Sequence, residues 1–126
     1  MCVATLMSVT FDCPDPDLLA SLYRRLLGLQ EAGATRDRSA IALRGAGCLI
    51  SFLRVQTHRP PTWPDGLQQQ QIHLDVATSD LEHDVTRAID LGAIPAEHQP
   101  RPDRWRVMID PAGHPFCLTT SRTTHA

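Results

Sequence analysis

The sequence predicts an α+β domain made of two tandem βαβββ modules, because three landmarks recur along its 126 residues at nearly constant spacing. The landmarks are a helix start, a helix end and the turn before a last strand. In that order the pairs are Asp15 and Asp80 (80 − 15 = 65), Gly28 and Gly92 (92 − 28 = 64), and Gly47 and Gly113 (113 − 47 = 66). A regular internal repeat of this kind indicates a duplication and largely decides the fold.

The first module is expected over residues 5–55. The alternating stretch "LMSVTFDC" is typical of a strand. A helix follows, with Asp15 as its N-cap, Pro16 in its first turn and Gly28 at its end. Short strands are then expected around 29–34, in "SAIALRG" and in "CLISFLRV".

A proline-rich linker is expected over residues 56–69, because "THRPPTWPDGLQQQ" cannot form an internal strand. The second module, over 70–120, repeats the order of the first. Its first strand is "QIHLDVA", its helix starts at Asp80, and "WRVMID" and "PFCLTT" are its last strands. Within the helix, Ile89 is among the apolar residues expected to point inward.

Composition excludes several classes of protein. The formal net charge is −2 and no basic stripe with interleaved aromatic residues is present, so we expect no nucleic-acid partner. No apolar run approaches the roughly 20 residues that span a bilayer, and the first residues lack the pattern of a signal peptide. The four cysteines show no CxxC spacing, which favours buried, reduced thiols and a cytoplasmic protein.

The sequence resembles the vicinal oxygen chelate superfamily, which includes glyoxalase I, bleomycin- and fosfomycin-resistance proteins and extradiol dioxygenases. The resemblance rests on "FDCPDPDLLASLYRRLLGL", "IHLDVATSDLEHDVTRAIDLGA" and "DPAGHPFCL", and it covers nearly the whole chain. It implies that the two modules form one domain, residues 1–126, whose curved, open sheet makes a cup flanked by two helices. A divalent metal often lies in that cup, but a fold alone does not define a function.

The resemblance also indicates where metal ligands would lie. Metal-binding relatives take them from the first and last strands of each half, positions that here correspond to Ser8, His73, Ser51 and Cys117. The alignment of Ser51 leaves Leu53 as an alternative. Serine hydroxyls are poor ligands for divalent ions, and a catalytic zinc site takes at least three protein ligands. We therefore expect no metal cofactor, with zinc, nickel or iron held by His73 and Cys117 as the alternative.

Two of these residues have both a structural and a functional interpretation. His73 is either a hydrogen-bonded strand histidine or a catalytic acid–base group. Cys117 is either a packed thiol or a nucleophile, which would need a cation to lower its pKa. His114 lies three residues from Cys117 and is expected on the opposite face of the strand.

Aromatic and basic residues complete the candidate site. Trp63 in the linker either pins the linker to the body or forms a flat wall for a planar ligand or a dimer contact. Trp105 is a second candidate, and one or two arginines at the rim could hold an anionic group. The predicted ligand-binding residues are Ser8, Ser51, Leu53, Trp63, His73 and Cys117.

Three functions remain open from the sequence. The first is binding of a small, partly aromatic or apolar molecule in the cup without a catalytic metal. The second is a metal-dependent lyase, isomerase or dioxygenase of the glyoxalase or bleomycin-resistance type. The third is a regulatory or interaction domain. A homodimer is expected in each case, because the open cup and the sheet edges need cover.

Overall fold

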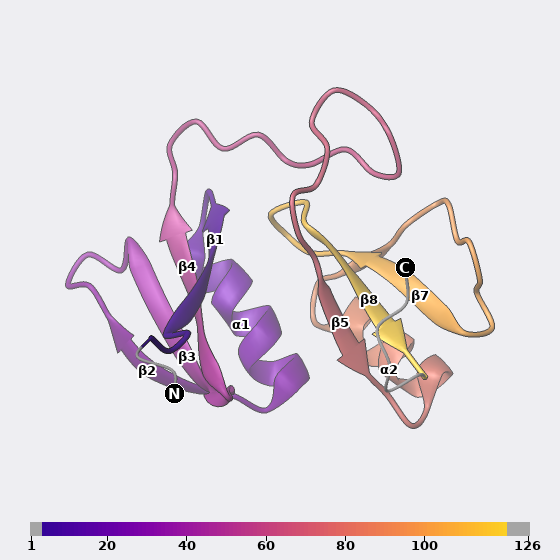
Figure 1. Ribbon diagram of the computed structural model, residues 1–126, viewed down its shortest axis with the longest axis horizontal. Coiled ribbons are helices and arrows are strands. Elements are labelled where there is room, and N and C mark those ends of the chain that lie inside the picture. The colour runs from indigo at the N-terminus through magenta and orange to yellow at the C-terminus, as the bar shows by residue number, and fades with distance from the viewer. Residues whose placement is uncertain (1–3, 121–126) are drawn as a thin grey trace. The chain divides into compact units, whose positions relative to one another are not determined.

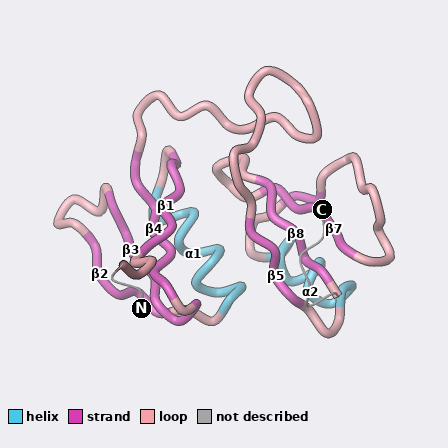
Figure 2. Tube along the Cα trace, viewed as in Figure 1, coloured by secondary structure: helices cyan, strands magenta, loops and turns pink. Residues whose placement is uncertain are grey.

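The computed structural model describes residues 4–120 and divides the chain into two compact units, with the boundary between His58 and Arg59. This boundary lies inside the linker predicted over 56–69. Residues 55–73 form the long loop between the strands β4 and β5, bounded below (Figures 1 and 2). Among the described residues, no helix is long and apolar enough to cross a membrane.

The first unit contains one helix and four strands. Strand β1 (Ser8–Cys13) leads to helix α1 (Pro16–Leu27), and then follow β2 (Gln30–Ala34), β3 (Ala40–Ala46) and β4 (Cys48–Arg54). The sheet order is β1-β4-β3-β2, in which β1 pairs parallel to β4 and the other pairs are antiparallel. Helix α1 packs on β3 and β4.

The second unit repeats this arrangement, which confirms the predicted duplication. It contains β5 (Leu74–Ala77), α2 (Leu81–Asp90), β6 (Ile94–Pro95), β7 (Trp105–Ile109) and β8 (Pro115–Thr119). The sheet order is β5-β8-β7-β6, with β5 parallel to β8 and the other pairs antiparallel. Each unit is therefore a βαβββ module with a four-stranded mixed sheet and one helix, the α+β architecture expected (Figure 1).

The predicted helix caps are present in both units. The Asp15 carboxylate accepts a hydrogen bond from the backbone N–H of Leu18, and the Asp80 carboxylate accepts one from that of His83. Each bond satisfies one of the backbone donors that a helix start leaves without a partner. Gly28 ends α1 in the left-handed conformation with φ of 66°, which glycine adopts without steric cost.

Each unit has an apolar core between its helix and its sheet. In the first unit the rings of Phe11, Tyr23 and Phe52 meet, and Tyr23 stacks on Phe52 with ring centres 5.8 Å apart. In the second unit, Met108, Phe116 and Leu118 are fully buried. All five residues of β8 are buried, so both faces of this central strand are shielded from solvent.

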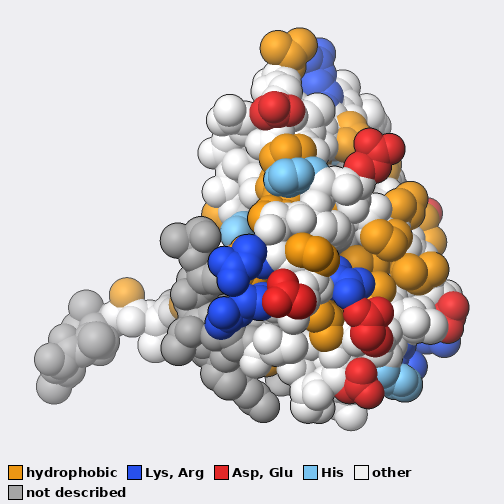
Figure 3. Space-filling model, turned by 90° about the vertical axis from the view of Figure 1, so that its right-hand side faces the viewer, with side chains coloured by type: hydrophobic (Ala, Val, Ile, Leu, Met, Phe, Trp, Pro, Cys, Tyr) orange, Lys and Arg blue, Asp and Glu red, His pale blue; other side chains and the backbone are white. Residues whose placement is uncertain are grey.

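Two details differ from the sequence prediction. The strand expected over 71–77 begins only at Leu74, so His73 lies just before β5. Ile89 of α2 is 45% exposed, although its spacing predicted an inward side chain. On the face shown in Figure 3, acidic, basic and apolar side chains are interspersed.

Candidate ligand pocket of the second unit

A cluster of three polar side chains lies where the parallel strands β5 and β8 meet. The strand register sets Asp75 opposite Cys117, so their side chains lie side by side. His73 precedes Asp75 by two residues, and its Nε2 lies 3.4 Å from Asp75 Oδ1. One donor atom from each of the three residues lies within 4.8 Å of the other two. We call these residues the His73–Asp75–Cys117 cluster.

The surroundings of Cys117 keep its thiol protonated. Burial raises the pKa of Cys117 to about 12, and the negative charge of Asp75 and a hydrogen bond with it act in the same direction. The Cys117 residue is only 6% exposed, whereas the side chains of His73 and Asp75 are 33% and 27% exposed. A neutral buried thiol supports the interpretation of Cys117 as a packed residue and not as a nucleophile.

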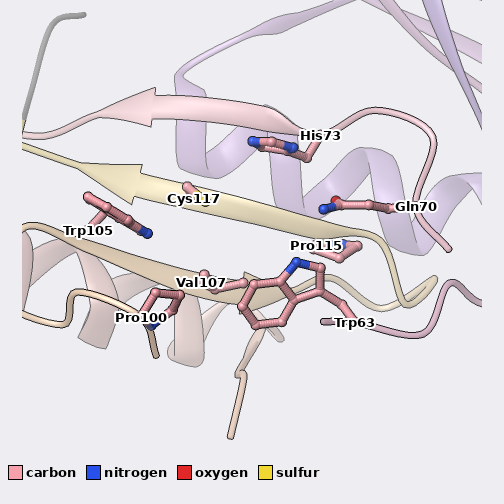
Figure 4. A pocket seen from close by; sticks show the side chains of 8 residues that line it. All are labelled: Trp63, Gln70, His73, Pro100, Trp105, Val107, Pro115 and Cys117. Atoms are coloured by element: carbon pink, nitrogen blue, oxygen red, sulfur yellow. The ribbon is translucent and has the colours of Figure 1, made fainter. Parts of the chain in front are cut away.

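A pocket of about 240 Å³ opens beside this cluster (Figure 4). Its walls are mainly aromatic and apolar side chains, with three polar groups among them. The lining residues are Trp63, Gln70, His73, Pro100, Trp105, Val107, Pro115 and Cys117. In β8, Pro115 and Cys117 face the pocket while the alternate residues Phe116 and Leu118 belong to the core, as strand geometry requires.

The two tryptophans reach the pocket from different segments. Trp105 begins β7, and the guanidinium of Arg101 lies 5.9 Å from the centre of its ring. Trp63 comes from the long loop, and its ring centre lies 5.6 Å from that of His98. Trp63 thus contacts the second unit and lines its pocket, and its part in ligand binding stays a prediction.

Gln70 is a pocket residue that sequence reasoning did not single out. Its Oε1 atom is buried and finds no hydrogen-bond donor among the described residues. A buried acceptor without a donor costs about 1 to 3 kcal/mol, so polar groups in this position are usually satisfied by water or a ligand. A run of four glutamines carries no signal that marks this one.

The remaining predicted residues lie in the first unit. Ser8 Oγ and Ser51 Oγ are 2.7 Å apart and share a hydrogen bond. The register sets Thr10 opposite Ser51, as it sets Asp75 opposite Cys117, so Ser51 and not Leu53 is the equivalent of Cys117. Leu53 is 42% exposed, and Ser51 borders a shallow depression that is otherwise lined by residues 33–35 and 40–42. Their part in ligand binding stays a prediction.

Asp75 is the main site residue that sequence reasoning missed. One signal was nevertheless present, because Asp75 is two residues from His73, the spacing that puts side chains on one face of a strand.

The residues at the superfamily's metal positions differ between the two units. In the first unit, Ser8 and Ser51 offer only hydroxyls, which are already bonded to each other. In the second unit the Asp75 carboxylate lies with His73 and Cys117, so three side chains that could hold a metal ion lie within 4.8 Å of one another. Nitrogen, sulfur and carboxylate oxygen are the ligands zinc takes in proteins. The second unit therefore fits a divalent ion, and the first does not.

Two repeated βαβββ units with polar groups at the parallel strand pair define a protein of the glyoxalase-like class. The family model described as a glyoxalase-like domain matches residues 8–119, and the chain belongs to this family within the vicinal oxygen chelate superfamily. No curated protein matches the sequence.

Solved structures with the same fold cover almost the whole chain. Fosfomycin resistance protein FosX from Listeria monocytogenes, in a mutant form complexed with Mn(II) and 1S,2S-dihydroxypropylphosphonic acid, has a TM-score of 0.71 at 15% identity, covering 96% of this chain and 92% of its own. FosX from Mesorhizobium loti has a TM-score of 0.69 at 16% identity, covering 95% of this chain and 94% of its own. A gene product from Arabidopsis thaliana has a TM-score of 0.67 at 17% identity, covering 94% and 99%. These likenesses establish the fold.

Proposed function

We propose that the protein binds a small, partly aromatic molecule in the pocket of the second unit. One observation carries this proposal: both tryptophans of the chain line the same cavity, together with His73. Ligand pockets are typically apolar and aromatic, with a few polar groups that fix orientation. The pocket described above has this composition.

Each part of the lining has a distinct contribution. The rings of Trp63 and Trp105 offer flat surfaces on which a planar group stacks. The imidazole of His73 and the amide of Gln70 provide hydrogen-bond donors and acceptors at the wall. A volume of about 240 Å³ suits a small molecule, since it lies just below the usual range of ligand pockets.

The proposal keeps to the metal-free binding expected from the sequence, because stacking and hydrogen bonding by these walls do not require a metal. A second candidate is a metal-dependent lyase, isomerase or dioxygenase of the glyoxalase type. The observation that favours it is the His73–Asp75–Cys117 cluster, whose three donors border or adjoin the pocket. The Mn(II) complex of the Listeria FosX mutant shows that one protein of this fold binds such an ion.

Intrinsic fluorescence tests the proposal directly, because Trp63 and Trp105 are the only tryptophans and both lie at the pocket. A panel of small aromatic compounds is titrated into metal-free protein with chelator present, and thermal stability is measured in parallel. We expect saturable changes in emission and a raised melting temperature for at least some compounds.

Trp63→Ala should weaken the binding of such a compound by about tenfold, as expected for loss of one stacking surface. Ile89→Ala on α2 is the matched control and should bind like the wild type, because Ile89 is exposed and does not line the pocket. Binding that appears only after metal is added would favour the metal-dependent enzyme. Absence of binding with and without metal would favour an interaction domain.

A further inference from the structure

We propose that Gln70 makes the pocket of the second unit selective for uncharged aromatic molecules that carry a hydrogen-bond donor, such as phenols or aromatic amines. The inference rests on the proposed function and deepens it, because it names the class of ligand that the same pocket takes. It starts from the Oε1 atom of Gln70, which is buried and finds no hydrogen-bond donor among the described residues. The side chain that carries this atom lines the pocket.

The long loop folds back on itself and brings Gln70 beside Trp63. Thr62 and Gln69 form an isolated parallel bridge, and the Thr62 N–H donates to the Gln68 carbonyl. The Gln68 N–H donates in turn to Thr62 Oγ1, 3.1 Å away. Trp63 and Gln70 each come one residue after a bridge partner, so they are neighbours on the two segments, and both line the pocket.

Two contacts hold this loop against the rest of the second unit. The ring centre of Trp63 lies 5.6 Å from that of His98. Pro60 packs so closely on the turn between β7 and β8 that a Cβ added at Gly113 would lie 2.5 Å from Pro60 Cβ. Because packed neighbours hold the loop, the Gln70 amide is in place before a ligand arrives, which lowers the entropy lost on binding.

The buried oxygen requires a donor from the ligand. An amide oxygen only accepts hydrogen bonds, and water can satisfy it in the free protein. A ligand that displaces this water keeps its affinity only if it returns the hydrogen bond. Figure 4 shows the Gln70 amide directed toward the space between His73 and Trp63. A hydroxyl or N–H group on the edge of an aromatic ring can meet the amide there while the ring lies against Trp63.

The charges around the pocket disfavour an anionic ligand. The eight described residues that line it include no lysine or arginine, and Arg101, which lies over the Trp105 ring, is not among them. His73 is the lining residue that can carry a positive charge, and its Nε2 already faces the Asp75 carboxylate at 3.4 Å. An anion would enter the pocket without a cation of its own and would face the Gln70 oxygen, so an uncharged donor is favoured.

Three matched compounds test this selectivity by calorimetric titration of the full-length protein with chelator present. 2-Naphthol carries a donor, 2-methoxynaphthalene has lost it, and 2-naphthoate is an anion. We expect 2-naphthol to bind about tenfold more tightly than 2-methoxynaphthalene, as expected for one hydrogen bond, and more tightly than 2-naphthoate. Gln70→Met keeps the length of the side chain but removes the acceptor. It should weaken binding of 2-naphthol about tenfold and leave that of 2-methoxynaphthalene unchanged.

Gln71→Met is the matched control, because it makes the same substitution at an exposed neighbour that does not line the pocket, and it should keep the preference for 2-naphthol. Thermal unfolding without ligand adds a second measurement. Gln70→Met should be at least as stable as the wild type, since the buried oxygen has no described donor to lose.

The outcomes separate this inference from the proposed function. Equal binding of 2-naphthol and 2-methoxynaphthalene by the wild type would overturn the inference and leave the proposed function standing. Tighter binding of 2-naphthoate would overturn it in favour of recognition by Arg101. A lowered melting temperature in Gln70→Met and not in Gln71→Met would also overturn it, because the amide would then have a structural partner. Absence of binding by all three compounds would overturn both proposals.

Discussion

Ser51 and Cys117 occupy the same place in two copies of one fold, yet their surroundings differ. Ser51 is half-buried and bonds to the Ser8 hydroxyl, a neutral partner. Cys117 is buried beside the carboxylate of Asp75 and close to His73. A thiol next to a negative charge in a buried place resists ionisation, so the chemical difference between the two units arises from both the residue and its neighbour.

The raised pKa of Cys117 leads to a prediction about Asp75→Asn. The folded protein favours the protonated thiol up to a pH of about 12, because burial and then Asp75 disfavour the thiolate. Replacing the carboxylate by an amide removes the repulsion but keeps the burial. We expect the pKa of Cys117 to fall while staying above the ordinary thiol value. Thiolate absorbance measured against pH, with Cys117→Ser as the blank, reports the change.

The matched control for this measurement is Asp103→Asn, which removes an exposed carboxylate from the same unit and should leave the Cys117 titration unchanged. An unchanged titration in Asp75→Asn would show that burial alone raises the pKa of the thiol.

His73 and Cys117 should contribute unequally to binding of the organic ligand. His73 is partly exposed and offers hydrogen bonds at the wall, whereas Cys117 is a small buried side chain. In metal-free protein we expect His73→Ala to weaken the binding of an aromatic compound by more than Cys117→Ala does. Cys117→Ala should lower the free energy of unfolding by on the order of 1 kcal/mol. Equal effects on binding, measured by titration of Trp fluorescence, would contradict this ranking.

Part of the site could be predicted from residues alone. The resemblance to the superfamily pointed to His73 and Cys117, and the aromatic character of Trp63 in the linker pointed to a wall for a planar ligand. The spacing of Asp75 from His73 is also local, but its place beside Cys117 comes from the strand register, which is a relation between distant strands. Gln70 is distinguished from its neighbours only by its buried, unpartnered oxygen, which no sequence pattern encodes.

At the scale of secondary-structure elements, the two helices begin in the same way. Asp15 caps α1 and Asp80 caps α2 through bonds to backbone N–H groups three residues further on. The Thr78 hydroxyl also accepts from the Asp80 N–H and donates to the Asp84 carboxylate at 2.5 Å. The start of α2 is therefore held by a small network in which the cap is one member.

Removal of either cap should destabilise the protein measurably. We expect Asp15→Ala and Asp80→Ala each to lower the free energy of unfolding by about 1 kcal/mol, the usual cost of a lost N-cap. Asp90→Ala at the last residue of α2 is the control, because a carboxylate there opposes the helix dipole and its loss should not destabilise. Urea denaturation gives these values, and a cap variant as stable as the wild type would contradict the prediction.

The helices could be predicted well because caps, end glycines and apolar spacing all lie within a few residues of each other. The strands were harder to predict from the sequence. β6 has only two residues, Ile94 and Pro95, and such a short strand shows no alternation to detect. β5 begins later than its sequence pattern indicates, because its pairing with β8 starts only at Leu74, opposite Phe116.

At the scale of the whole molecule, the duplication leaves two sheets with two outer strands each. In the first unit, every residue of β2 is exposed, and in the second unit both residues of β6 are exposed. Exposed outer strands present unpaired backbone N–H and C=O groups and are places where another chain can pair. Pro95 in β6 lacks an N–H group, which weakens that strand as a surface for pairing. β2 is therefore the stronger candidate for pairing with another chain.

We therefore expect the protein to form a homodimer in solution, with β2 at the contact between its two copies. Light scattering over a range of concentrations measures the molar mass, and the expected value is twice that of the 13.9 kDa chain. Ala32→Lys places a charge in the middle of β2, where a paired strand would have to bury or displace it, and should shift the protein toward the monomer.

Ile94→Lys on β6 is the matched control, since it adds the same charge to an exposed residue of the other outer strand, and it should remain dimeric. A monomer at high concentration would contradict the dimer itself, whereas dissociation by Ile94→Lys and not by Ala32→Lys would place the contact at β6.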